Sequence, residues 1–120
     1  MVENLLIRFV DSAISAELLK QVAAERFGDM VKAVVDVERK VMAIGGELHA
    51  DEEQYLLENG SIPTDLWGIN IYINQPLPQA VEFDSMINVR PSQANRSRGV
   101  DNEELRKKII GVVQSLVGQP

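Results

Sequence analysis

The sequence predicts an α+β fold of two layers, in which three helices pack on one face of a mixed or antiparallel sheet of about five strands. Five segments carry the short apolar runs, or the alternation of apolar and polar residues, that are typical of strands. Three other segments repeat apolar residues at the spacing of an amphipathic helix. The order along the chain is β-α-β-β-α-β-β-α, and helices interspersed with hairpins favour a two-layer arrangement around one core.

The first half of the chain contains three of these strands and the first helix. Residues 5–10 are an apolar run, and Ser15 is in position to cap the helix that follows by accepting a hydrogen bond from its first turn. Residues 30–37 are rich in valine, and residues 41–45 are mainly apolar. Because only a short charged connection separates these two segments, we expect a hairpin.

The second half contains two helices and two further strands. Asp51 is expected to cap a short helix, and isoleucine alternates with polar residues at 69–73. Residues 81–89 also alternate, which predicts a second hairpin with one apolar and one polar face. The last helix covers residues 102–117, with Asp101 as its N-cap, and its apolar stripe is expected to pack on the apolar face of the fifth strand.

Length and composition indicate a single globular domain, residues 1–120, with 45% hydrophobic and 25% charged residues. The net charge of −6 argues against general nucleic-acid binding and against binding to a membrane surface. The absence of cysteine excludes disulfides and thiolate metal sites. The sequence shows no secretion signal and no membrane-spanning apolar stretch, so we expect a cytoplasmic protein, and no motif indicates a cofactor or a metal.

A basic loop at residues 88–99 is the first candidate site. It contains three arginines in a stretch without acidic residues, and it leads into the start of a helix. The planar guanidinium suits phosphate and carboxylate groups, and a helix N-terminus also favours anions. The alternative is that the arginines pair with the protein's own carboxylates, since 18 acidic residues stand against 12 basic ones. The expected ligand-binding residues are Arg90, Ser92, Asn95, Arg96, Ser97 and Arg98, with Asn70 and Trp67 beside them.

The second candidate is an acidic cluster around the only histidine. Glu47 and His49 follow two glycines and could act together in general acid–base catalysis. With Asp51, Glu52 and Glu53 they could also hold a divalent metal. However, no established metal-site spacing is present, and acidic residues are common in the first turn of a helix. We therefore favour a structural histidine and predict no metal.

Polar side chains on the last two strands form a third group. In one interpretation they are the solvated outer face of a sheet, which is the usual case. In the other they are the floor of a ligand pocket with the arginine loop as its rim. Trp67 likewise either lines a pocket or packs in the core, and we favour the core. The polar residues, which lead toward Arg90, are Asn70, Tyr72, Glu82, Asp84 and Asn88.

Distinctive strings occur at five places: GDMVKAVVDV (28–37), AIGGELHAD (43–51), LLENGS (56–61), DLWGINIY (65–72) and FDSMINVRPSQANRSR (83–98). In these strings the chain resembles a small prokaryotic protein family of unknown function. The resemblance extends over nearly the whole chain after the first helix. It implies a complete single-domain protein of about this length, and it implies no particular activity or catalytic residue.

These observations favour a small ligand-binding or regulatory domain that takes an anionic group at the loop of residues 88–99. One alternative is a hydrolase-like enzyme that uses Glu47 and His49, so the sequence leaves open whether the protein is an enzyme. Another alternative is a structural or oligomerising protein, in which the loop only joins a strand to a helix. The expected partner is a small anionic ligand, with a homo-oligomer under the last alternative.

Overall fold

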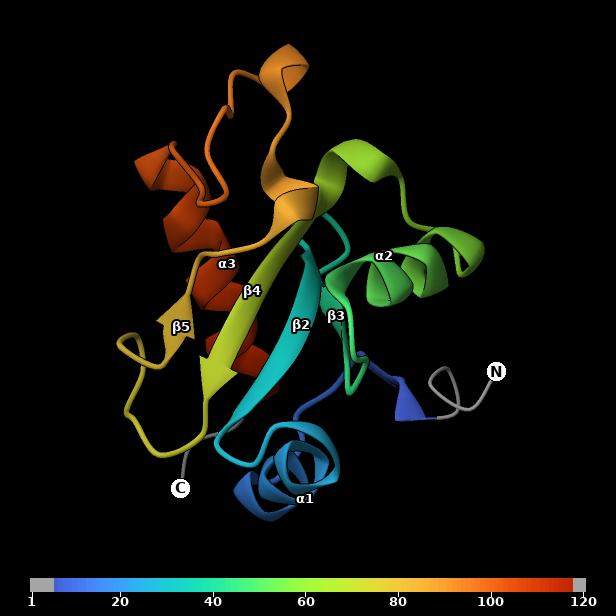
Figure 1. The fold of residues 1–120 in the computed structure, drawn as a ribbon, viewed down its shortest axis with the longest axis vertical. Coiled ribbons are helices and arrows are strands. Elements are labelled where there is room, and N and C mark those ends of the chain that lie inside the picture. The colour runs from blue at the N-terminus through green and yellow to red at the C-terminus, as the bar shows by residue number, and fades with distance from the viewer. Residues whose placement is uncertain (1–5, 118–120) are drawn as a thin grey trace.

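Residues 6–117 are described by a computed structural model, and within them five strands form one sheet (Figure 1). The strands are β1 (Arg8–Val10), β2 (Met30–Asp36), β3 (Val41–Ile44), β4 (Leu66–Tyr72) and β5 (Val81–Glu82), and they lie in the order β1-β3-β2-β4-β5. The α-helices are α1 (Ala16–Arg26), α2 (His49–Glu58) and α3 (Glu103–Leu116). Short 3-10 helices occur at η2 (Pro63–Asp65), η3 (Met86–Asn88) and η4 (Pro91–Gln93).

The predicted α+β class and the predicted order of the main elements are confirmed. All strand pairs of the sheet are antiparallel. The longest pair joins β2 to β4, from Met30 opposite Tyr72 to Asp36 opposite Leu66. These two strands form the centre of the sheet and position the side chains discussed below.

The helices cover both faces of the sheet, which differs from the prediction that they pack on one face in two layers. Helices α1 and α3 pack on the face that carries Val35, Trp67 and Ile69. Helix α2 packs on the opposite face, against Val34 and Leu66 (Figure 1). Val34 and Val35 are both fully buried although they are neighbours in β2, because consecutive apolar residues of a central strand need cover on both sides. The sheet is therefore the middle of three layers.

The fifth strand is much shorter than predicted. Of residues 81–89, only the first two form β5, and the chain then leaves the sheet through η3 and η4. Val81 and Phe83 belong to the core under α3, whereas Ile87 packs on the α2 side and Val89 is exposed. The predicted single apolar face of residues 81–89 is therefore wrong beyond Phe83.

The helix starts agree with prediction at α1 and differ at α2 and α3. The Ser15 hydroxyl caps α1 as predicted. Asn102 caps α3 in place of Asp101, whose carboxylate accepts instead from the Ser97 hydroxyl. Helix α2 begins at His49, before the predicted cap, and has no side-chain cap. None of the helices within residues 6–117 is long and apolar enough to cross a membrane.

Candidate functional site

A pocket of about 510 Å³, here called the polar pocket, opens on the α2 side of the sheet. Strands β2, β4 and β5 form its floor, the start of α2 forms one wall, and the segment after β5 forms another. Most of its chemical groups were separate candidates in the sequence, and the fold brings them together. Its polar side chains are Lys32, His49, Asn70, Tyr72, Glu82, Asp84, Ser85 and Arg98.

Strand register aligns the floor of the polar pocket. Lys32 of β2 lies opposite Asn70 of β4, which in turn lies opposite Glu82 of β5. The Asn70 Nδ2 atom donates to Glu82 Oε1 at 2.9 Å, and the Tyr72 hydroxyl donates to the same oxygen at 3.1 Å. The hydrogen bond to Glu82 raises the pKa of Tyr72, so the phenol stays protonated at neutral pH. Within the described residues, Oε2 of Glu82 accepts no hydrogen bond and is open to a ligand.

His49, the first residue of α2, forms a wall of the polar pocket. Its Nε2 atom lies 2.8 Å from the carbonyl oxygen of Ile69, and because a carbonyl oxygen only accepts, Nε2 carries the proton. Burial lowers the pKa of His49, the charge of Lys32 lowers it further, and the hydrogen bond to Ile69 acts in the opposite direction. The ring is therefore neutral at pH 7, with Nδ1 as an acceptor.

Two cationic side chains border the polar pocket, and each has N–H donors that make no hydrogen bond within residues 6–117. Arg98 Nε donates to Asp84 Oδ1 at 2.6 Å, while the two terminal nitrogens of Arg98 make no hydrogen bond within residues 6–117. The Lys32 ammonium lies 5.4 Å from the centroid of the Phe27 ring and has no ion pair in the same part of the chain. Both cations can therefore donate to an anionic group, while Glu82 and Asp84 balance the charge of the pocket.

Two large apolar side chains also line the polar pocket, and both face solvent. Leu48 is 54% exposed and Met86 is 65% exposed. Leu48 comes from the N-cap of α2 and Met86 from the start of η3, so they approach the pocket from its two walls. A ligand that occupies the pocket would remove part of this apolar surface from water.

Asn88 holds the segment after β5 against β4 where no strand is present. Its Oδ1 accepts from the Gly68 N–H at 2.8 Å, and its Nδ2 donates to the Gly68 carbonyl oxygen at 2.9 Å. One amide thus satisfies both backbone groups that a neighbouring strand would bond. Glycine is required here, because a Cβ atom at Gly68 would lie 2.6 Å from Ser85 Cβ. The Nδ2 atom also donates to the Arg98 carbonyl oxygen, which positions Arg98 at the pocket; Asn88 itself is buried and does not line it.

Arg90, which the sequence places in an anion site, is bonded to the protein itself. Its guanidinium carbon lies 4.6 Å from the centroid of the Trp67 ring, and Nη2 lies 3.6 Å from Glu53 Oε2. Trp67 packs in the core below α3, as favoured from the sequence. Arg90 thus pairs with one of the protein's own carboxylates, which is the alternative to an anion site. The guanidinium also donates to three backbone carbonyl oxygens, those of Pro63, Leu66 and Ile87.

Two polar residues of the loop hold its own backbone. Asn95 is buried, and its amide donates to carbonyl oxygens of the loop while its Oδ1 accepts from the Asp101 N–H. The Ser97 hydroxyl donates to Asp101 Oδ1 at 2.6 Å. That hydrogen bond lowers the pKa of Asp101, which therefore stays ionised. These contacts fix the loop that carries Arg98.

The three arginines of the loop do not share one site. Arg90 points inward, Arg98 lines the polar pocket, and Arg96 is exposed without an ion pair in the described part of the chain. Ser92 is also exposed. Of the predicted ligand-binding residues, the structure thus brings only Arg98 and Asn70 to the polar pocket.

Glu47 and His49, the predicted acid–base pair, have different partners. Glu47 Oε1 lies 3.9 Å from Arg26 Nη1, whereas His49 bonds to the backbone of β4. Glu53, also in the acidic cluster, pairs with Arg90. Among residues 6–117, no group of three or more His, Cys, Asp or Glu side chains is placed to hold a metal ion.

Lys32 is a pocket residue that the sequence reasoning missed. It is a charged residue within a valine-rich strand, and a charge at such a position indicates that its side chain reaches solvent or a polar site. Its position beside Asn70 depends on which strand pairs with β2 and in which register, and that is set by contacts far apart in the sequence.

Comparison with known protein families matches residues 8–116 to a family described as "Protein of unknown function (DUF5674)". No curated protein and no solved structure matches the chain. The family match extends from the first residue of β1 to the last residue of α3, so it includes every residue of the polar pocket. It also confirms the resemblance to an uncharacterised family. The chain belongs to the DUF5674 family of proteins of unknown function.

Proposed function

We propose that this protein binds a small polar molecule in the polar pocket and works as a ligand-binding or regulatory domain. The observation that carries the proposal is that Lys32 and Arg98 both border the pocket and keep donors that make no hydrogen bond within residues 6–117. Arg98 already pairs with Asp84, whereas Lys32 has no ion pair within residues 6–117. A cation at a pocket wall is costly to leave without a partner once a ligand excludes water, so the ligand is expected to supply one to Lys32.

The groups around the polar pocket define the class of ligand. The Arg98 terminal nitrogens and the Lys32 ammonium are both donors that favour an anionic group, phosphate or carboxylate. The free Oε2 of Glu82 selects a hydrogen-bond donor elsewhere on the ligand, and Leu48 and Met86 can cover an apolar part. This proposal keeps the anion predicted from the basic loop but assigns it to Arg98 rather than to all three arginines.

Two other functions have less support. A hydrolase that uses Glu47 with His49 would need the two side chains to act on one substrate, and they have different partners. An oligomerising role would use the exposed side chains of Leu48 and Met86. Sedimentation of the protein at increasing concentration tests that role, and a dimer that disappears in Met86→Lys would favour it over a ligand pocket.

The single histidine makes a direct binding experiment possible. The His49 ring lines the polar pocket, so its NMR resonances should shift when inorganic phosphate, acetate, an amino acid or a nucleoside monophosphate binds there. A ligand that binds only the folded state also raises the melting temperature, by the equivalent of about 2.7 kcal/mol at a hundred times Kd.

Matched variants locate the site. Arg98→Ala should remove the response to the active probe, whereas Arg96→Ala, which removes the same charge from the same loop, should leave it intact. Both variants should fold normally: Arg98→Ala loses an exposed ion pair, which contributes only about 0–1 kcal/mol, and Arg96 has no ion pair within residues 6–117. Equal loss of binding in the two variants, or no probe that shifts the His49 resonances, would contradict the proposal.

A further inference from the structure

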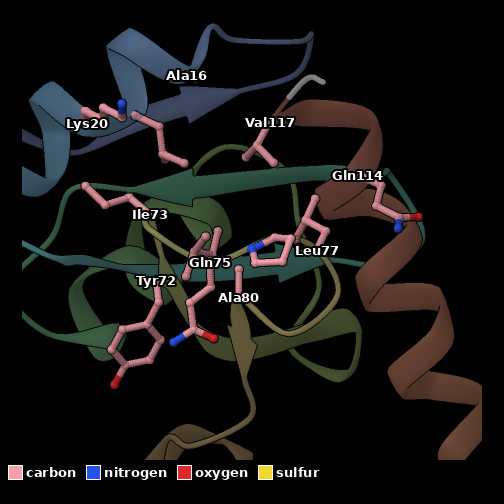
Figure 2. A pocket seen from close by; sticks show the side chains of 12 residues that line it. Ala16, Lys20, Tyr72, Ile73, Gln75, Leu77, Ala80, Gln114 and Val117 are labelled. Atoms are coloured by element: carbon pink, nitrogen blue, oxygen red, sulfur yellow. The ribbon is translucent and has the colours of Figure 1, made fainter. Parts of the chain in front are cut away.

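A second pocket, here called the apolar pocket, lies on the other face of the sheet (Figure 2). Its volume is about 340 Å³, and it opens between α1, the end of α3, and the segment that joins β4 to β5. Leu19, Ile71, Ala80 and Val117 of the main core form its base. The pocket therefore extends the core to the surface.

The walls of the apolar pocket are held by backbone hydrogen bonds. The Ile14 N–H donates to the Leu116 carbonyl oxygen at 2.8 Å and so ties the start of α1 to the end of α3. The Tyr72 N–H donates to the Ala80 carbonyl oxygen at 2.8 Å and closes the loop that forms the third wall. A pocket that is already formed loses little conformational entropy when a ligand enters.

Charge distinguishes the apolar pocket from the rest of this acidic surface. The protein has a net charge of −6, yet among residues 6–117 no carboxylate lines the pocket. In that part of the chain Lys20 of α1 is the single charged lining residue, and it has no ion pair there. Figure 2 shows Lys20 on the α1 side, with Ile73 and Leu77 across the opening.

We propose that the apolar pocket binds a free amphiphile, a molecule with an unbranched apolar tail and one anionic head such as a medium-chain carboxylate. The tail lies against Leu19, Ile71, Leu77 and Val117, and the head lies at the mouth beside Lys20. Tyr72 lines both pockets, but the Lys20 side chain and the apolar base of this pocket lie on the face of the sheet opposite the Lys32 and Arg98 side chains of the polar pocket.

Isothermal titration with a series of saturated carboxylates tests this site. From hexanoate to decanoate, each added methylene should tighten binding by about fourfold, since a buried CH₂ contributes about 0.8 kcal/mol. The gain should stop when the pocket is full. A gain that continues unchanged to tetradecanoate would indicate non-specific adsorption and would overturn the proposal, as would binding to phosphatidylglycerol vesicles without binding of any free carboxylate.

Two variants and one control test where the apolar tail and the anionic head of the amphiphile bind. Ala16→Trp changes an exposed residue at the mouth and should weaken decanoate and decanol alike by about tenfold or more, because the indole occupies the pocket. Lys20→Gln should weaken decanoate by about two- to fivefold, the size of an exposed ion pair, and leave decanol unchanged. Lys107→Gln removes an exposed lysine elsewhere and should change neither.

Further comparisons separate this site from the polar pocket. Arg98→Ala should leave decanoate binding unchanged even if it abolishes binding in the polar pocket. Decanoate affinity that is unaffected by Ala16→Trp, or that is lost in Arg98→Ala, would show that the amphiphile does not bind here.

Discussion

The guanidinium carbon of Arg90 lies 4.6 Å from the centroid of the Trp67 ring, so the first arginine of the basic loop is packed on the aromatic side chain of β4. The side chain of Arg90 is only 13% exposed, and burial lowers its pKa, with Glu53 acting in the opposite direction. This contact fixes the loop to the sheet. It also explains why a basic loop in an acidic protein need not bind a ligand at each of its arginines.

Arg90→Ala is expected to destabilise the fold by about 2–4 kcal/mol, because it leaves partly buried carbonyl oxygens without their donor. Arg90→Lys should fall between the parent and the alanine variant, since an ammonium keeps the charge near Glu53 but cannot reproduce the planar fork. Urea denaturation measures both. Arg96→Ala is the control and should stay within about 0.5 kcal/mol of the parent. A loss in Arg90→Ala no greater than in this control would show that the stacking has no structural role.

Asn88→Ala is expected to cost about 2–3 kcal/mol, because the buried Gly68 N–H then has no acceptor. The Gly68 amide should also exchange with solvent hydrogen faster than its neighbours in β4, which NMR can follow. Asn74→Ala, at an exposed asparagine of the segment after β4, is the matched control. Unchanged protection of Gly68 in Asn88→Ala would mean that the Asn88 amide does not replace a strand at this edge.

Glu52 is expected to make the protein less stable as the pH rises. It is fully buried, and desolvation raises its pKa well above the ordinary value of 4.5, although the hydrogen bond from the Gly46 N–H acts against this. The folded state therefore holds this proton more tightly than the unfolded chain. The stabilisation is fully present below pH 4.5 and is progressively lost above it.

Urea denaturation of Glu52→Gln at pH 5 and pH 8 checks this direction. Relative to the variant, the parent should lose stability between the two pH values, since glutamine cannot ionise. Glu47→Gln, at an exposed glutamate in the same region, should show the same pH dependence as the parent. Parallel pH profiles for the parent and Glu52→Gln would contradict the raised pKa.

The sequence by itself was sufficient for the fold class, the order of the main elements and the cap of α1. These features depend on local patterns: the apolar stripe of α3, the alternation along β4, and a serine before the first helical turn. It also indicated that Asn70, Tyr72, Glu82 and Asp84 share a polar surface, because residues two apart on a strand point the same way. The prediction extended this surface through Asn88 to Arg90, whereas Arg98 lines the pocket in the structure.

Tertiary structure alone decided which side of the sheet α2 covers, where β5 ends, and what each arginine does. All three depend on partners distant in sequence. The Asn88 amide bonds to Gly68 in place of a longer strand, and that contact carries Arg98 to the polar pocket while Arg90 turns toward Trp67. Sequence periodicity predicts which face of its own helix or strand a residue occupies. The role of an arginine depends instead on whether carbonyl oxygens, an aromatic ring or solvent surrounds its guanidinium in the folded protein.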